Sequence, residues 1–125
     1  MVTTEAIFYP RSISPIKLVA GSKPIAVLVR AVGPTLAQFG VTGVFPNPRL
    51  TLFRDANIIA TNDDWGEVGP ATIAGTGAAF GAFVLSSDSR DAAIVATVQP
   101  GSYTAQVSGV GGTGGGALVE VYEVP

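Results

Sequence analysis

Apolar and polar residues alternate along most of this 125-residue chain. The clearest case is "YTAQVS" (103–108), in which every second residue is apolar. Successive side chains of a strand point to opposite faces, so this period of two predicts a strand with one buried face. Similar segments predict further strands at residues 3–9, 16–20, 25–31, 49–54, 57–61, 92–98 and 117–123.

Turn-forming residues separate these segments. "RDAN" (54–57) places Asp55 and Asn57 between two predicted strands, and "QPGS" (99–102) places a Pro-Gly pair between two others. Asp, Asn and Gly tolerate turn conformations, and proline presets the first backbone angle of a turn. Strands joined in this way predict an all-β fold: an antiparallel β-sandwich, jelly-roll or immunoglobulin-like, with about eight short strands.

Helix is expected at two places at most. "PTLAQFG" (34–40) fits a single turn ended by Gly40, and the glycines of residues 70–83 argue against a long helix there. With no linker and no internal repeat, residues 1–125 are expected to form a single β-sandwich domain. Pro10 and Pro15 set off residues 1–10 as an N-terminal arm or edge strand, which either pairs with its own sheet or crosses to a neighbour's.

The composition excludes several classes of function and says less about the fold. The chain has no cysteine and no histidine, so it lacks disulfides, thiolate nucleophiles and the commonest general base. The net charge is −2 with scattered basic residues, and no apolar run approaches the length of a membrane span. We therefore expect no catalysis, no nucleic-acid partner and no membrane insertion.

The glycine run "GVGGTG" (109–114) has the spacing of a dinucleotide-binding loop. Such a loop needs a helix after it to bind the pyrophosphate, whereas the residues that follow here alternate as a strand. The run is therefore interpreted as a loop between the last two strands, and no nucleotide cofactor is expected.

An acidic stretch, "TNDDWGE" (61–67), follows the fifth predicted strand. Ca²⁺ prefers carboxylate, carboxamide and carbonyl oxygens, and the candidate ligands here are Asn62, Asp63 and Asp64, with Glu67 and Asp91 as further candidates. Alternatively, Asn62 or Asp63 caps backbone N–H groups of its own turn. The residues alone leave both interpretations open.

Aromatic residues suggest a second kind of site. Trp65, the only tryptophan, lies in this polar loop, so it is a candidate platform for stacking a sugar ring, or else it covers the edge of the core. Tyr103 and Tyr122 lie in well-patterned strands and are expected to be buried, and Phe83 is expected to pack inward.

Two long segments resemble a known family. "LTLFRDANIIATNDDWG" (50–66) and "SRDAAIVATVQPGSYTAQVSGVGGTGGGALVEVYE" (89–123) are similar to the β-sandwich modules of large bacterial secreted and surface proteins, broadly the pre-peptidase C-terminal domains. "VLVRAVGPTLAQFGV" (27–41) fits a recurring variant of these modules. The chain departs from the family pattern at "RDAN" and in its long glycine loop.

The resemblance implies an extracellular or cell-surface, non-catalytic accessory module. In some relatives an Asp-Asp turn binds calcium, which maps here onto Asp63 and Asp64 with Asn62 beside them. Our first hypothesis is a structural or interaction module that self-assembles into an oligomer or filament, through strand edges or exchange of the N-terminal arm. The alternative is a calcium-supported module that binds carbohydrate or another surface. Apart from calcium, no cofactor is expected.

Overall fold

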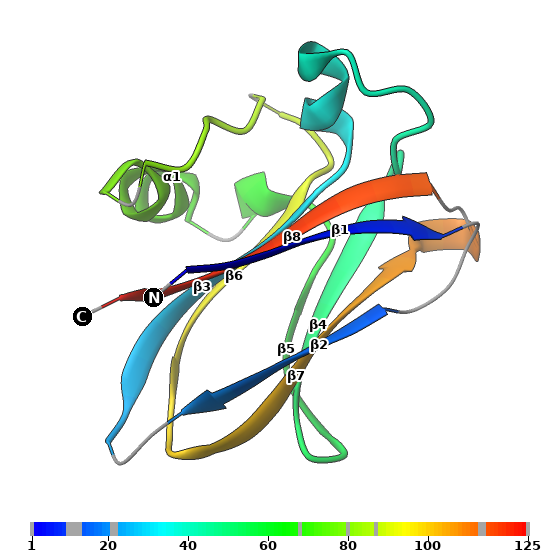
Figure 1. The fold of residues 1–125 in the computed structure, drawn as a ribbon. Coiled ribbons are helices and arrows are strands. Elements are labelled where there is room, and N and C mark those ends of the chain that lie inside the picture. The colour runs from blue at the N-terminus through cyan, green and yellow to red at the C-terminus, as the bar shows by residue number, and fades with distance from the viewer. Residues whose placement is uncertain are drawn as a thin grey trace.

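Eight strands form two antiparallel sheets that pack face to face (Figure 1). The computed structural model describes residues 2–9, 14–20, 23–67, 69–79, 81–86, 88–112 and 115–124. The strands are β1 Val2–Tyr9, β2 Ser14–Ala20, β3 Ile25–Val32, β4 Pro48–Arg54, β5 Asn57–Asn62, β6 Ala92–Val98, β7 Gly101–Gly109 and β8 Gly115–Val124. This confirms the predicted all-β sandwich and the "RDAN" turn, which forms the β4–β5 hairpin. The "QPGS" turn joins β6 of one sheet to β7 of the other.

The sheets have the strand orders β1-β8-β3-β6 and β2-β7-β4-β5. β8 and β3 are the central strands of one sheet and β7 and β4 those of the other, and β1 and β2 each form one edge. β1 pairs with β8, from Val2 opposite Tyr122 to Tyr9 opposite Gly115. The first and last strands of the chain therefore lie side by side (Figure 1). The opposite edges of the two sheets are β6 and β5.

The interior between the sheets is filled by the alternate residues that the sequence pattern predicted. On β3, Val27, Val29 and Ala31 are fully buried there. The same interior cluster takes residues from the neighbouring strands β6 and β8 and from the facing strands β4 and β7: Ile94, Val119, Val121, Leu50, Leu52, Tyr103, Ala105 and Val107. Tyr103 is thus buried in the core, as expected.

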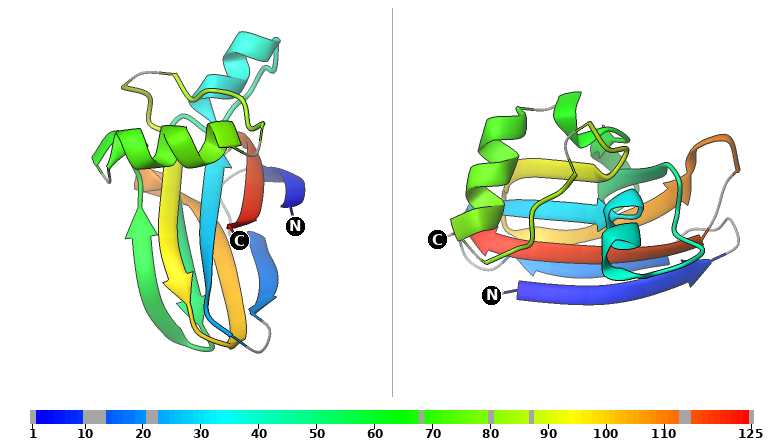
Figure 2. Two further views of the ribbon diagram at one scale, coloured as in Figure 1. Left: turned by 90° about the vertical axis from the view of Figure 1, so that its left-hand side faces the viewer. Right: turned by 90° about the horizontal axis from the view of Figure 1, so that it is seen from above.

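A second apolar cluster lies on the outer face of the sheet that contains β3. Figures 1 and 2 show this face covered by α1 (Pro70–Ala79) and by the 3-10 helices η1 (Pro34–Phe39) and η2 (Trp65–Glu67). The cluster consists of Leu28, Val32, Trp65, Ile73, Leu85, Ala93 and Tyr122. β3 is thus covered on both faces, which explains its nearly continuous apolar sequence "IAVLVRAV".

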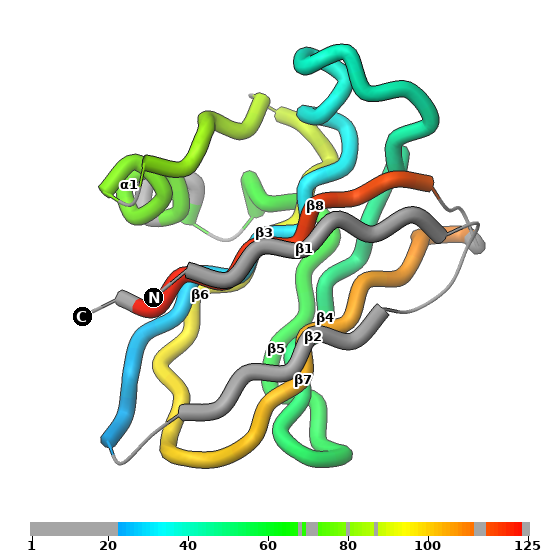
Figure 3. The backbone as a smooth tube through the Cα atoms, in the orientation of Figure 1, coloured from blue at the N-terminus to red at the C-terminus, as the bar shows by residue number. Residues whose placement is uncertain are grey.

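Helices form at both places where the sequence suggested them, residues 34–40 and 70–83. η1 ends at Gly40, which adopts the left-handed conformation with φ +81°, as predicted for residues 34–40. α1 reaches ten residues despite its glycines. Gly77 of α1 is buried and faces Arg30 of β3, where a Cβ would lie in ordinary van der Waals contact with the arginine side chain. Figure 3 traces residues 81–86 from α1 towards η1 before the chain enters β6.

Candidate functional site

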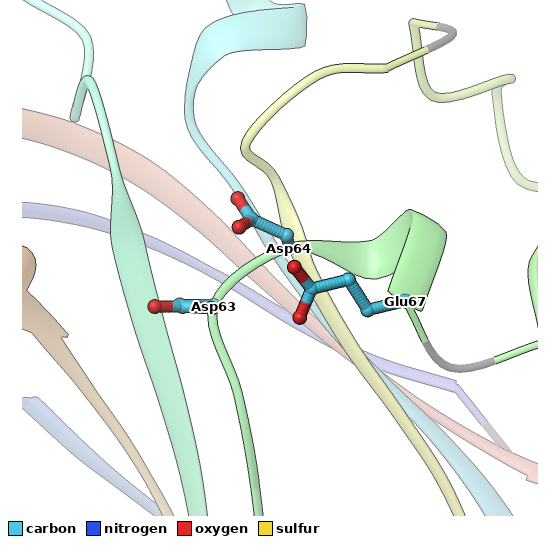
Figure 4. A group of neighbouring side chains, drawn as sticks. All are labelled: Asp63, Asp64 and Glu67. Atoms are coloured by element: carbon cyan, nitrogen blue, oxygen red, sulfur yellow. The ribbon is translucent and has the colours of Figure 1, made fainter.

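The turn after β5 brings three of the predicted ligands together. One carboxylate oxygen from each of Asp63, Asp64 and Glu67 lies within 4.8 Å of the others. In Figure 4, Asp63 and Asp64 leave the segment before η2, and Glu67 reaches back from η2 towards Asp64. The backbone bends here, with the Glu67 amide donating to the Asp64 carbonyl at 3.1 Å, so neighbouring aspartates need not point to opposite sides as in a strand. We call residues 62–67 the acidic turn.

Burial differs within the acidic turn. Asp63 and Asp64 are half-buried and Glu67 is exposed. The Asp64 Oδ1 atom is buried and has no hydrogen-bond partner among the described residues. An unpaired buried acceptor costs on the order of 1–3 kcal/mol, so this oxygen would be stabilised by a cation or a water molecule. Arg49 and Arg90 border the surface hollows beside the turn and offset part of its negative charge.

Asn62 holds the turn in shape. Its side chain is 7% exposed, the amide nitrogen donates to the Asp64 carbonyl at 3.0 Å, and the amide oxygen accepts from the Ala93 backbone N–H at 3.0 Å. These bonds tie the end of β5 to β6. Asn62 therefore bonds a carbonyl of its own turn and an N–H of β6, which differs from the predicted capping of N–H groups within the turn.

Asp91 is fully buried, and its carboxylate accepts hydrogen bonds that hold neighbouring segments together. Its Oδ1 accepts from the Gly33 N–H at 2.7 Å and the Thr35 N–H at 3.2 Å, and its Oδ2 accepts from the hydroxyls of Thr35 and Ser89. Both oxygens are therefore occupied by groups at the start of η1 and before β6. The geometry does not support Asp91 as a metal ligand.

Trp65 is buried rather than exposed. Only 8% of its surface is accessible, and Nε1 donates to the Ser86 carbonyl at 3.3 Å and the Ser89 hydroxyl at 3.1 Å. The ring packs in the outer cluster, which agrees with the expectation that Trp65 covers the edge of the core. It does not agree with the alternative that the ring is an open platform for a sugar. Among the described residues, Phe39 of η1 has an exposed ring, which is 60% exposed.

A buried charged network lies beneath α1. Arg30 and Glu120 are direct neighbours across β3 and β8, with Nε and Oε1 2.8 Å apart. The Tyr122 hydroxyl donates to Glu120 Oε2 at 2.9 Å, and Arg30 Nη1 donates to the Phe83 carbonyl at 2.8 Å. Burial, together with the hydrogen bond and negative charge of Glu120, raises the pKa of Tyr122 to about 12. Burial of Tyr122 was expected.

Sequence reasoning missed this network. The signal was present, because Arg30 interrupts an otherwise apolar strand and Glu120 lies between apolar residues in "ALVEVY". A charge in such a position needs a buried partner, and the register of β3 with β8 supplies it. A small pocket adjoins the network, bounded by α1 and by Phe83, which packs against the Arg30 guanidinium at 4.7 Å.

The fold defines the class of protein: a β-sandwich module with helices over one outer face. A scan against protein-family models and a search of curated proteins find no match. Among solved structures, the chain is similar to the pre-peptidase C-terminal domain of a collagenase from Bacillus anthracis. The TM-score is 0.56 at 9% identity, over 98% of this chain and 88% of that one.

The chain is also similar to PliG of Aeromonas hydrophila, a periplasmic inhibitor of g-type lysozyme. That match has a TM-score of 0.53 at 13% identity, over 99% of this chain and 85% of PliG. A family 35 carbohydrate-binding module from Clostridium thermocellum aligns with a TM-score of 0.44 at 12% identity, over 97% of this chain and 91% of that one. The predicted resemblance to pre-peptidase C-terminal domains is confirmed at the level of the fold. Among the described residues, no helix is long and apolar enough to cross a membrane.

Proposed function

We propose that this chain is a non-catalytic interaction module of extracellular or cell-surface proteins, which joins copies of itself through open strand edges. The observation that carries the proposal is the edge formed by β5 and β6. These strands end the two sheets on the same side and lie against each other. Their sequences, "NIIATN" and "AAIVATV", contain none of the charges or prolines that commonly protect edges. β2, at another edge, contains both Pro15 and Lys17.

Apolar side chains are exposed along this β5–β6 edge. Ile58 and Ile59 of β5 are 63% and 45% exposed, and Val95 of β6 is 41% exposed. A hollow of about 140 Å³ separates the two strands and is lined by residues of both, including Ala60 and Ile94. A strand from another copy could pair with the outer backbone groups of β5 or β6 and cover these side chains.

Exchange of the N-terminal strand offers a second route to the same assembly. β1 forms the edge of its sheet by pairing with β8 alone. A neighbour's β1 would satisfy the same backbone groups of β8, as in domain-swapped oligomers. The fold similarity to a collagenase's pre-peptidase C-terminal domain and to a periplasmic inhibitor supports an accessory role outside the cytoplasm.

Sedimentation velocity at rising protein concentration tests the proposal. We expect wild type to associate and the Ile58→Lys/Val95→Lys variant to stay monomeric, because two charges would be buried without partners in the paired edge. The matched control is Val84→Lys, which changes a residue that is 80% exposed and off the edge. Deletion of residues 1–10 separates strand exchange from edge pairing. A monomeric wild type at millimolar concentration would contradict the proposal.

As a second candidate function, we infer that the acidic turn binds Ca²⁺ and so supports a surface-binding role. Oxygens on opposite sides of a calcium ion lie about 5 Å apart, so the oxygens of Asp63, Asp64 and Glu67, which all lie within 4.8 Å of one another, are close enough to share one ion. The buried, unpartnered Oδ1 of Asp64 favours a cation independently of that spacing. Three protein ligands leave several positions to water, so we expect an affinity near 10⁻⁴–10⁻³ M, as in extracellular modules.

Thermal melting with millimolar calcium or with a chelator tests this site. We expect calcium to raise the melting temperature of wild type and to have no effect on Asp64→Asn, which removes one charged ligand. Asp55→Asn is the matched control, because Asp55 is exposed at the β4–β5 hairpin and its φ of +53° suits asparagine. Identical melting curves for wild type with and without calcium would rule the site out.

A further inference from the structure

The pocket beneath α1 is small and mostly apolar. Its volume is about 40 Å³, and its walls include Ile73 and Gly77 of α1 and Phe83 and Leu85 of the segment that follows. One water molecule needs roughly 10–15 Å³ measured in this way. The pocket is therefore suited to a group of three or four non-hydrogen atoms.

Arg30 is one of the residues that line this pocket. Its side chain is 3% exposed; Nη1 donates to the Phe83 carbonyl and Nε lies beside Glu120. The remaining nitrogen, Nη2, is buried and has no hydrogen-bond partner among the described residues. A buried donor without an acceptor is unfavourable, so an occupant that carries an oxygen acceptor would be stabilised here.

The charge of Arg30 decides which acceptor fits. Glu120 already balances the guanidinium. A carboxylate in the pocket would bury a negative charge without a counterion, which is costly, whereas a neutral carbonyl oxygen accepts the Nη2 hydrogen at no such cost. The chemistry therefore favours a neutral amide or acyl group over an acid.

An exposed aromatic ring lies beside the pocket. Phe39 contacts Phe83 edge to face, with ring centroids 5.0 Å apart, and is 60% exposed. Figure 2 shows η1, which ends at Phe39, and α1 on the same side of the sandwich. Phe39 could thus support the apolar face of a ring whose substituent enters the pocket.

We propose that this pocket binds the acetamido group of an N-acetylated amino sugar. The carbonyl oxygen accepts from Arg30 Nη2, the methyl group packs against Ile73 and Leu85, and the sugar ring lies on Phe39. An acetamido group has four non-hydrogen atoms, in keeping with the volume. The site uses neither the β5–β6 edge nor the carboxylates of the acidic turn, so it stands apart from both proposals above.

A two-dimensional ¹H–¹⁵N NMR titration tests the site directly. We expect N-acetylglucosamine to give saturable shifts at the Arg30 side chain and at the Gly77 and Leu85 amides, and glucosamine to give none. N-acetyl-lysine amide has the acetamido group without a sugar ring, so we expect weaker binding. Equal or tighter binding of the lysine derivative would overturn the assignment to a sugar, as would the absence of saturable shifts with N-acetylglucosamine.

Two glycines of α1 provide a matched pair of variants. A Cβ at Gly77 would lie 3.5 Å from Arg30 Nη1 and 3.6 Å from Ala82 Cβ, so Gly77→Ala puts a methyl group at the pocket without a severe clash. A Cβ at Gly75 meets nothing within 4 Å, so Gly75→Ala brings the same gain in helix propensity and leaves the pocket open.

We expect Gly77→Ala to weaken N-acetylglucosamine binding about tenfold or more and Gly75→Ala to leave it unchanged. Ile58→Lys and added chelator should also leave it unchanged. Unaltered binding in Gly77→Ala would overturn the proposal. Loss of binding in Ile58→Lys, or on chelation, would place the sugar at the β5–β6 edge or the acidic turn, and so would also overturn it.

Discussion

At the scale of single residues, Asp91 connects several segments that are separate in the sequence. Its carboxylate accepts from Gly33, Thr35 and Ser89, and its carbonyl accepts from the Trp65 N–H at 2.8 Å. These bonds hold the end of β3, the start of η1 and the acidic turn around the start of β6. The carboxylate is fully buried, so it stabilises the fold only while all of these donors remain hydrogen-bonded to it.

We expect Asp91→Asn to lower the free energy of unfolding by about 2–4 kcal/mol. The amide nitrogen would face donors and accept from none of them, which leaves buried N–H and O–H groups unpaired. Urea denaturation in calcium-free buffer measures the change. Asp55→Asn, at the exposed hairpin, should change stability by less than about 0.5 kcal/mol. Equal effects of the two substitutions would contradict this role of Asp91.

Tyr122 gives the fold a dependence on alkaline pH. Its pKa is about 12 in the folded protein and near 10 when unfolded, so the folded state favours the protonated phenol. The resulting stability is fully present below pH 10 and is lost as the pH rises to 12. Two pKa units correspond to roughly 2–3 kcal/mol.

Guanidinium denaturation between pH 8 and 11.5 checks this expectation. Tyr122→Phe has no phenol to ionise, so its stability should fall less steeply above pH 10 than that of wild type. Parallel pH profiles for the two proteins would count against the raised pKa. The difference between the slopes is the relevant measurement, because the substitution also removes a hydrogen bond to Glu120 and lowers stability at every pH.

At the scale of elements, the junction between β3 and η1 depends on close backbone packing. A Cβ at Gly33 would overlap the Phe45 carbonyl oxygen far inside van der Waals contact. The amide of Gly33 also donates to Asp91, so the backbone is held on both sides. Gly33 therefore allows the segment that contains Phe45 to pack directly on the end of β3.

We expect Gly33→Ala to destabilise the protein by about 2–3 kcal/mol, since either the backbone or Phe45 must move. Gly66→Ala is the control, because a Cβ at Gly66 meets nothing within 4 Å. Thermal and urea unfolding measure both variants. If Gly33→Ala is as stable as Gly66→Ala, the close approach of the two segments is not required for the fold.

Elements were easier to predict than the contacts between them. The period of two in β7 and the turn residues at Asp55 and Pro100 are local, so the sequence predicted the strands and the turns between them. That the turn at Pro100 crosses from one sheet to the other is not contained in a local pattern. Asp63, Asp64 and Glu67 lie within five residues, and their proximity was also predictable. Arg30 meets Glu120 only through the register of two strands far apart in the sequence, which no local pattern contains.

At the scale of the whole molecule, the first and last strands pair, so the two ends of the chain lie close together. β1 and β8 lie side by side, and Figure 1 shows the N- and C-terminal ends close together. The tip of the β4–β5 hairpin, at Asp55 and Ala56, is exposed. Chain ends that lie together and an exposed tip are the conditions under which circular permutation succeeds.

We expect a circular permutant to fold when a short Gly/Ser linker joins the old ends and the chain opens between Asp55 and Ala56. Circular dichroism should show a cooperative melting transition. A permutant opened between Val29 and Arg30, in the middle of β3, should not fold, because both faces of that strand are buried. Failure of the hairpin permutant, or folding of both, would contradict this description of the fold.

The pairing of Val2 with Tyr122 also determines how the molecule would respond to mechanical force. Tension applied through the two ends would load the β1–β8 hydrogen bonds one after another, as in opening a zip, and not all together in shear. β1 would then peel away at low force, before the sandwich unfolds. The edge of β8 that this uncovers could accept a strand from a neighbouring copy, so a pull on one module could promote its linkage to the next.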